Sequence, residues 1–204
     1  LVAAAAATAL PVVGPNCLGL FVPGRLDTLF LPPERLVPVP PGGVALVSQS
    51  GGFLVDEMIR FAAQGVGVSL ALSVGNKDVV DEVDLIGALA EDPETRVLAF
   101  YVEGFRTGEG RRFALAAQRC PKPVVVLKSG RTAAGRRAVS SHTASLAGDH
   151  AVFSAALRQH GVFEARDAFE MASLCESLSA YPTHVPVRRV GVLTGSGGHR
   201  ALAV

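Results

Sequence analysis

Two residues of this chain are well suited to nucleophilic or acid–base chemistry, the histidine His142 and the glutamate Glu103. His142 lies in a long polar stretch, residues 128–148, which interrupts an otherwise apolar alternation of strands and helices. A connection of this length inside a compact domain is either functional or disordered, and its flanking residues favour a functional loop. Glu103 directly follows the apolar run 97–102, and a carboxylate at the end of a buried strand needs a partner.

Glycine-rich turns supply a candidate phosphate site beside these residues. Ser50, Gly51 and Gly52 precede a predicted helix, where small residues let backbone amides approach a ligand and the helix N-terminus favours an anion. Gly197 and Gly198 repeat this arrangement near the end of the chain. Turns of this kind occur throughout folds that alternate strands and helices, so neither turn alone establishes an anion site. Two of them in one chain favour a phosphate bound between them.

These parts permit more than one kind of chemistry. A carboxylate that hydrogen-bonds one imidazole nitrogen fixes the tautomer and makes the other nitrogen more nucleophilic. Beside a bound phosphate, such a histidine suggests a phosphohistidine, although the same parts could serve as a general base. Two plainer readings also stay open: His142 as a solvated surface residue, and Glu103 as a helix cap or an ion-pair partner of Arg106.

The elements that must position these residues follow a regular pattern. Apolar runs predict strands and helical spacing predicts intervening helices. The strands are expected at 44–48, 68–74, 97–102, 123–127 and 162–163, and the helices at 53–64, 81–89, 108–119, 150–160 and 167–180. This alternation predicts an α/β fold, a flavodoxin-like doubly wound parallel sheet with strand order 2-1-3-4-5. Residues 1–13 predict an Ala-rich helix and a short strand, and residues 21–42 predict a Pro-rich extended linker.

The topology brings the candidate residues to one edge of the predicted sheet. Ligands of open parallel sheets bind at the carboxyl ends of the strands, beside the point where the strand order reverses. The first predicted strand leads into Ser50, and the third leads into Glu103. The loop that carries His142 leaves the same edge.

Composition excludes several other functions. The net charge of +1 gives no reason to expect nucleic acid or an anionic membrane as a partner. No apolar run is long enough to span a bilayer. Cys17, Cys120 and Cys175 are odd in number and lack metal-type spacing, which favours a reducing, cytoplasmic compartment without disulfides or a metal site. The chain lacks an initiator Met and ends within a pattern, so we expect a piece of a larger protein.

Several motifs together resemble a known family. They are Gly14-Pro-Asn-Cys-Leu-Gly, Ser48-Gln-Ser-Gly, Ser73-Val-Gly-Asn-Lys, Tyr101-Val-Glu-Gly, Leu127-Lys-Ser-Gly-Arg-Thr and Ser141-His-Thr-Ala-Ser-Leu-Ala-Gly. The set, which covers nearly the whole chain, resembles the NDP-forming acyl-CoA synthetases, relatives of the succinyl-CoA synthetase α subunit. The resemblance implies that an ATP-grasp module passes phosphate from ATP to a histidine on a mobile loop. The phosphohistidine then phosphorylates a carboxylic acid, and CoA displaces phosphate to give acyl-CoA.

The resemblance also implies roles and domain boundaries. His142 matches the phosphorylated histidine and Glu103 the glutamate that orients it. Phosphate binding is implied for Ser50, Gly51, Gly52, Gly197 and Gly198, and binding of CoA or the acyl group for Asn16, Cys17 and Asn76. Residues 1–42 would be the tail of a CoA-binding Rossmann-type domain plus the linker, residues 43–183 the succinyl-CoA synthetase-like domain, and residues 187–204 the start of a ligase-CoA type domain.

Some features depart from the family pattern or leave other functions open. Ala144 stands where many members carry Gly, and Gly75-Asn-Lys-Asp-Val-Val lacks the usual residue order.

The substrates implied by the resemblance are a carboxylic acid, CoA and ATP or ADP with Mg. The nucleotide module, an expected partner in an oligomer, is absent, so we expect no ligase activity from this chain alone. A regulatory domain fused to a protein acetyltransferase and a citrate-lyase-type CoA enzyme are the alternatives.

Overall fold

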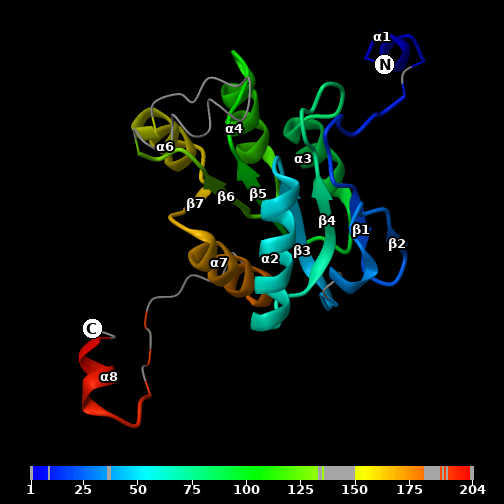
Figure 1. Cartoon of the computed structure of the whole chain (residues 1–204). Coiled ribbons are helices and arrows are strands. Elements are labelled where there is room, and N and C mark those ends of the chain that lie inside the picture. Colours follow the sequence, from blue (N-terminus) through cyan, green and yellow to red (C-terminus); the bar gives the residue numbers. More distant parts are fainter. Residues whose placement is uncertain are drawn as a thin grey trace.

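One mixed sheet, flanked by helices, organises the part of the chain that carries the candidate site (Figure 1). The computed structural model describes residues 2–8, 10–35, 38–132, 135, 150–181, 189, 191 and 193–202. The strands are β1 (Leu20–Val22), β2 (Leu26–Asp27), β3 (Pro41–Ser48), β4 (Val68–Ser73), β5 (Val97–Val102), β6 (Val124–Lys128) and β7 (Phe163–Ala165). The helices are α1 (Val2–Thr8), α2 (Gly51–Gln64), α3 (Glu82–Glu91), α4 (Glu109–Arg119), α6 (His150–Gln159), α7 (Ala168–Ala180) and α8 (Gly197–Leu202), with a 3₁₀ turn, η1, at Pro33–Arg35.

The five parallel strands confirm the predicted order. The sheet runs β2-β1-β4-β3-β5-β6-β7, and its parallel part, β4-β3-β5-β6-β7, is the expected 2-1-3-4-5 arrangement. Its central strand β3 is paired on both sides and covered on both faces, so the run from Val44 to Val47 is at most 1% exposed. Continuous apolar runs are characteristic of such doubly covered parallel strands.

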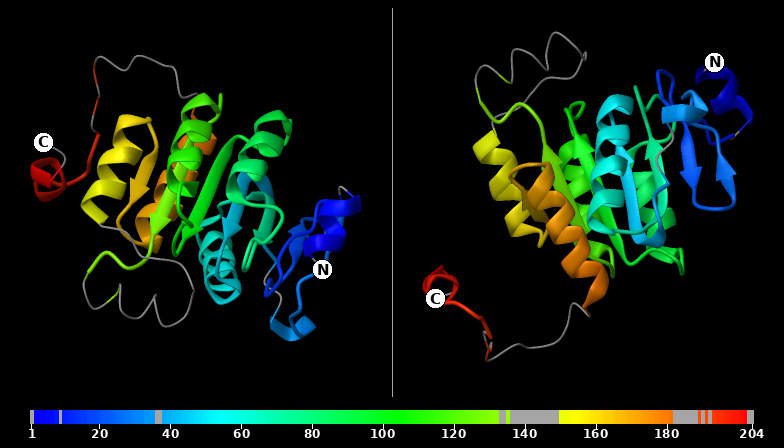
Figure 2. Two further views of the ribbon diagram at one scale, coloured as in Figure 1. Left: turned by 90° about the horizontal axis from the view of Figure 1, so that it is seen from above. Right: turned by 60° about the horizontal axis from the view of Figure 1, so that its bottom comes forward.

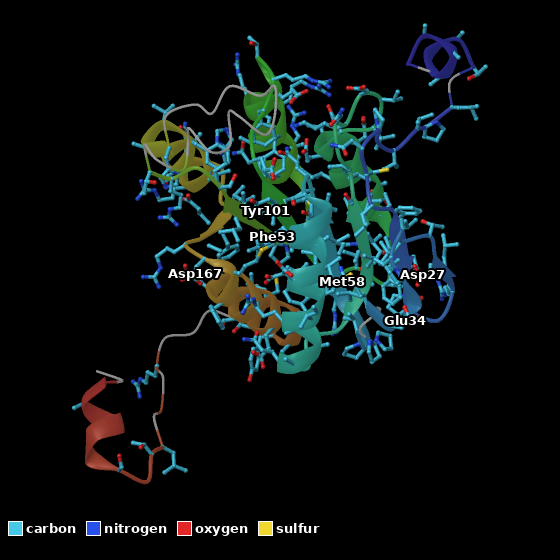
Figure 3. The ribbon with its side chains drawn as sticks, viewed as in Figure 1. Asp27, Glu34, Phe53, Met58, Tyr101 and Asp167 are labelled. Carbon is cyan, nitrogen blue, oxygen red and sulfur yellow. The ribbon has the colours of Figure 1, made fainter. Side chains whose placement is uncertain are left out.

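Helices cover both faces of the sheet (Figure 2). Helices α2 and α7 pack on one face with Val44 and Leu46, whereas α3, α4 and α6 pack on the other with Ala45 and Val47. The two faces of β3 thus belong to two separate apolar cores, as the alternation of side chains along a strand requires. On the first face, Phe53 of α2 stacks on Tyr101 of β5 with ring centroids 3.8 Å apart (Figure 3).

The N-terminal region differs from the prediction. The expected linker over 21–42 instead contains the antiparallel hairpin of β1 and β2, and β1 extends the sheet by pairing antiparallel with β4. The prolines of this region do not prevent the pairing because Pro23 follows β1 and the next proline, Pro32, follows the hairpin. The short strand expected near residues 11–13 is not formed, whereas α1 agrees with the predicted Ala-rich helix.

A buried carboxyl group lies between α2 and α7. The Glu57 side chain is fully buried, and its Oε2 accepts a hydrogen bond of 3.2 Å from Arg60 Nε. Its Oε1 has no hydrogen-bond partner among the described residues. Burial raises the pKa of Glu57 to about 7, an effect that Arg60 partly opposes. Burial also raises the pKa of the Cys175 thiol on α7, and the charge of Glu57 adds to this effect.

The C-terminal residues stand apart from the sheet. Helix α8 begins at Gly197, within the glycine turn that was expected to precede a helix, and lies away from the other described helices (Figures 1 and 2). Residues 189, 191 and 193 are not in a strand, and the residues between them lie outside the described ranges. None of the helices in the described part of the chain combines the length and apolar character needed to cross a membrane.

Candidate functional site

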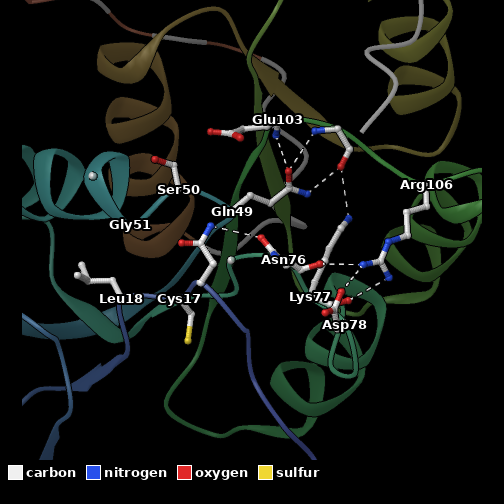
Figure 4. Close-up of a pocket in the computed structure, with 14 residues that line it drawn as sticks. Cys17, Leu18, Gln49, Ser50, Gly51, Asn76, Lys77, Asp78, Glu103 and Arg106 are labelled. Carbon is white, nitrogen blue, oxygen red and sulfur yellow. Dashed lines mark hydrogen bonds and ion pairs between the residues drawn. The ribbon is translucent and has the colours of Figure 1, made fainter. Parts of the chain in front are cut away.

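A polar pocket of about 690 Å³ opens where β3, β4 and β5 end (Figure 4). Seven of the predicted site residues line it, namely Asn16, Cys17, Ser50, Gly51, Gly52, Asn76 and Glu103. They come from four separate chain segments that the strand order brings together. The pocket lies at the carboxyl edge of the parallel strands, where the topology predicts a ligand site.

The N-terminus of α2 forms one wall of the pocket. Ser50 caps the helix, because its hydroxyl accepts a hydrogen bond of 3.2 Å from Phe53 N–H. The amides of Gly51 and Gly52 belong to the first turn, where a helix offers N–H groups that it cannot satisfy itself. A side chain at position 51 would collide with Leu18, so glycine is required there for the two segments to meet. This wall can therefore present backbone donors to an anion.

The opposite wall is built from two turns that interlock. Asp78 N–H donates to Gly14 O and Asn76 N–H to Pro15 O, at 3.0 Å and 2.9 Å. The side chains continue the contact, since Asn16 Nδ2 donates to Asn76 Oδ1 at 3.3 Å. Gly75 has a φ of +55°, and a Cβ there would collide with the carbonyl oxygens of Pro15 and Asn16. The Asn16 and Asn76 side chains are thus held together at the pocket.

Glu103 begins the loop that follows β5. Its carboxylate points to the side of the pocket where Ser50 lies (Figure 4). Its backbone carbonyl accepts a hydrogen bond of 2.7 Å from Lys128 Nζ, which also donates to Ser129 O at 2.6 Å. Burial lowers the pKa of Lys128, and the charge of Glu103 partly offsets this effect.

A buried lysine, which sequence reasoning did not select, supports the pocket from below. Lys77 is 6% exposed, and its Nζ lies 2.9 Å from Glu82 Oε2 and 3.0 Å from Glu109 Oε2. The same ammonium lies 4.7 Å from the ring centre of Phe105. These contacts tie the Asn76 turn to the first residues of α3 and α4. The signal in the sequence was the Lys that follows Asn76. Of its two carboxylate partners, Glu82 lies only five positions away, whereas Glu109 is distant along the chain.

Arg106 lines the pocket in a different way from that considered in the sequence. Its Nη2 lies 2.7 Å from Asp78 Oδ1 and donates to Asn76 O at 3.0 Å. Its backbone N–H donates to Glu109 Oε2 at 2.7 Å. The shorter ion pair of Arg106 is therefore with Asp78, a longer one of 3.9 Å joins its Nε to Glu109 Oε1, and the guanidinium closes the Asn76 turn.

Three predicted site residues are not placed at the pocket. His142 lies outside the described residues. Gly197 and Gly198 open α8, which lies apart from the sheet, so the structure does not bring them to the pocket (Figure 1). Among the described residues there is also no cluster of three or more His, Cys, Asp or Glu side chains that could hold a metal ion.

Comparison with known proteins identifies the domain. Residues 41–178 match the model of a family described as the succinyl-CoA ligase-like flavodoxin domain. The chain belongs to this family. The matched residues run from the start of β3 into α7, and they include the whole parallel part of the sheet. The fold and the resemblance inferred from the sequence motifs are thus confirmed.

Relatives of this flavodoxin-type domain occur in larger proteins. An ADP-forming acetate–CoA ligase of Methanocaldococcus jannaschii is 34% identical over 195 residues, 94% of this chain and 27% of that protein. The α subunit of ADP-forming acetate–CoA ligase I of Pyrococcus furiosus is 36% identical over 94% of this chain and 41% of its own length. The chain thus spans less than half of either relative.

A solved structure shows the same fold. It is the dinucleotide-forming acetyl-coenzyme A synthetase 1 of Ca. Korarchaeum cryptofilum, in complex with phosphate and ADP. The superposition has a TM-score of 0.81 with 38% sequence identity, and it covers 89% of this chain and 39% of that one.

Proposed function

We propose that this chain is the phosphohistidine-carrying part of an ADP-forming acid–CoA ligase. The curated relatives that share its succinyl-CoA ligase-like domain include ADP-forming ligases for acetate and for 4-hydroxybutyrate. The whole enzyme would join a carboxylic acid to CoA with ATP as the phosphoryl donor. The nucleotide, with its Mg ion, would be bound by an ATP-grasp domain or subunit.

The proposed reaction has three transfers. The γ-phosphoryl group of ATP passes to an imidazole nitrogen of His142, and ADP leaves. The substrate carboxylate then takes the phosphoryl group and becomes an acyl phosphate, which restores the free imidazole. The CoA thiolate attacks the acyl carbon, the bond to the phosphate oxygen breaks, and phosphate leaves.

The residues of this chain would bind and orient the reacting groups. The first-turn amides of Gly51 and Gly52 would hold the transferred phosphoryl group, because backbone donors at a helix N-terminus favour an anion. Glu103 would fix the tautomer and orientation of His142 by accepting a hydrogen bond from one of its ring nitrogens. Asn16, Cys17 and Asn76 would contact the acyl group or the thiol end of CoA.

One observation carries this proposal: the pocket joins a helix N-terminus with the Glu103 carboxylate. An anion site alone would suit many functions. A carboxylate beside an anion site is useful when a cationic or proton-bearing group must be oriented there, and an imidazole meets that need.

The test uses the full-length protein, with its nucleotide-binding partner, and ATP labelled in the γ-phosphate. We expect acid-labile, base-stable label on the protein, and we expect none in the His142→Ala variant. The His160→Ala variant is the matched control, because His160 lies at the end of α6 and its ring Nδ1 contacts Ala156 O. That control should label like the wild type.

Glu103→Gln tests the orienting carboxylate separately. Loss of a hydrogen-bonded orienting partner reduces function by roughly 10–100-fold in comparable sites, so labelling should slow by this order. The proposal of a phosphohistidine would be contradicted if the folded wild-type protein took no label. It would also be contradicted if the His142→Ala variant were still labelled. An unchanged rate in Glu103→Gln would remove Glu103 from the mechanism.

A further inference from the structure

The side chain of Gln49 makes four hydrogen bonds around the residue proposed to orient the histidine (Figure 4). Its Oε1 accepts from the backbone N–H groups of Glu103 and Gly104, at 2.7 Å and 3.0 Å. Its Nε2 donates to Gly104 O at 2.9 Å and to Glu82 Oε1 at 2.6 Å. Both ends of the amide are thus fully used by neighbouring groups.

These bonds continue the sheet beyond the last strand pair. The pairing of β3 with β5 ends where Ser48 meets Tyr101, and Gln49 N–H still donates to Tyr101 O. After this point the backbone of β3 turns into α2. The Gln49 amide then takes the place of a peptide group, since it accepts from and donates to the backbone that follows β5. The start of the Glu103 loop is thereby held as part of the sheet.

The Glu103 backbone is held from its other side as well. Lys128, at the end of β6, donates to Glu103 O at 2.7 Å, while Gln49 Oε1 accepts a hydrogen bond from Glu103 N–H. Two side chains, one directly after β3 and one at the end of β6, therefore fix both polar backbone groups of Glu103. A backbone held in this way limits where its carboxylate can lie.

The neighbourhood requires a neutral amide at position 49. Glu82 Oε1 accepts from Gln49 Nε2, while its Oε2 lies 2.9 Å from Lys77 Nζ. A carboxylate at position 49 would keep the acceptor for the two backbone N–H groups. It would lose the donors to Gly104 O and to Glu82, however, and would place a second negative charge against the buried Glu82. The orientation of the amide is fixed by this arrangement of donors and acceptors.

We propose that Gln49 is a positioning residue that sets the place of the Glu103 carboxylate at the pocket. This inference rests on the proposed phosphoryl transfer for its kinetic consequence. Its structural consequence, the protection of the Glu103 and Gly104 amides, is independent of that function. Gln49 would act through Glu103 and would not contact the transferred group.

The experiment uses the full-length protein and variants at positions 49, 82, 103 and 118. Gln49→Met removes all four hydrogen bonds with little change in volume, and Gln49→Glu keeps the acceptor alone. The double variant Gln49→Glu with Glu82→Gln exchanges donor and acceptor and conserves the total charge. Gln118→Met is the control, because Gln118 is exposed on α4. Amide hydrogen exchange at residues 103 and 104 is measured beside the rate of labelling by γ-labelled ATP.

We expect faster exchange at both amides in Gln49→Met, and labelling slower by an order of 10–100-fold at an unchanged half-saturating ATP concentration. The double variant Gln49→Glu with Glu82→Gln should be labelled more than about tenfold faster than Gln49→Glu alone, since it restores a hydrogen bond to a charged group. The variant that combines Gln49→Met with Glu103→Gln should be labelled little more slowly than Glu103→Gln alone, because the effects of coupled residues are not additive.

Three results would overturn the inference: unchanged amide exchange in Gln49→Met, wild-type labelling in that variant, or losses that multiply in the combined variant. If Gln49→Met does not fold, the labelling rate of the double variant Gln49→Glu with Glu82→Gln decides. A rate no faster than that of Gln49→Glu contradicts the proposal. If the wild type takes no label, the proposed function fails, and amide exchange alone decides whether Gln49 positions Glu103.

Discussion

Replacement of the buried Lys77 by methionine tests the foundation of the pocket. Lys77 Nζ lies between Glu82 and Glu109 at 2.9 Å and 3.0 Å, and the three side chains are 6%, 3% and 11% exposed. At an effective dielectric constant of about 20, each contact supplies roughly 6 kcal/mol of attraction. Desolvation of the three charges offsets much of this, whereas Lys77→Met leaves two carboxylates without their cation. We therefore expect a loss of about 3–5 kcal/mol in the free energy of unfolding.

Urea unfolding of the full-length protein measures this loss, with an exposed ion pair as the control. Arg25 and Glu94 lie as close, at 3.0 Å, but their side chains are 69% and 57% exposed. Arg25→Met should therefore cost no more than about 1 kcal/mol. In a background that carries Glu82→Gln and Glu109→Gln, Lys77→Met should cost less than it does alone, because neither partner of Lys77 then carries a charge. Equal effects of Lys77→Met and Arg25→Met would refute the reasoning.

Two further substitutions test other parts of the fold. Glu57 keeps its proton to about pH 7 when folded and loses it near the ordinary value of 4.5 when unfolded, so stability falls as the pH rises through this window. Glu57→Gln should remove this fall. In urea unfolding, the free energy of unfolding of the variant relative to the wild type should therefore be about 2–3 kcal/mol higher at about pH 8 than at about pH 5. Parallel pH profiles of the two proteins would contradict this expectation. Gly75→Ala should destabilise the Asn16 turn, whereas Gly87→Ala, in an open position of α3, should be neutral or stabilising by about 0.5–1 kcal/mol. Thermal unfolding compares the two, and equal midpoints would show that the turn tolerates a side chain.

The sequence predicts the parallel sheet well because its strands carry a strong signal. The run from Val44 to Val47 is apolar at every position, and that pattern is typical of a strand covered on both faces. The hairpin of β1 and β2 is missed because its strands have only three and two residues, and the surrounding prolines suggest an extended chain. Its pairing depends on the free edge of β4, which local patterns do not describe.

The candidate site is predictable where backbone geometry decides it. Gly51 and Gly52 stand out because a helix that starts at a strand end needs small residues to present its amides. The partners of Lys77 and Gln49 could not be predicted in this way. The Gln49 side chain contacts residues 33 to 55 positions away, and Lys77 contacts Gly104, 27 positions away, as well as the nearby Glu82. Only the packing of α3 and the Glu103 loop against the pocket brings the distant partners together.

A pulse–chase measurement tests the proposed phosphohistidine most directly. The full-length enzyme is first labelled with γ-labelled ATP, freed of nucleotide, and then mixed with a carboxylic acid and CoA. We predict that the label leaves His142 as phosphate, that acyl-CoA appears in equal amount, and that CoA alone releases no label. Label that stays on the protein while acyl-CoA forms from fresh ATP would contradict a phosphohistidine on the reaction path.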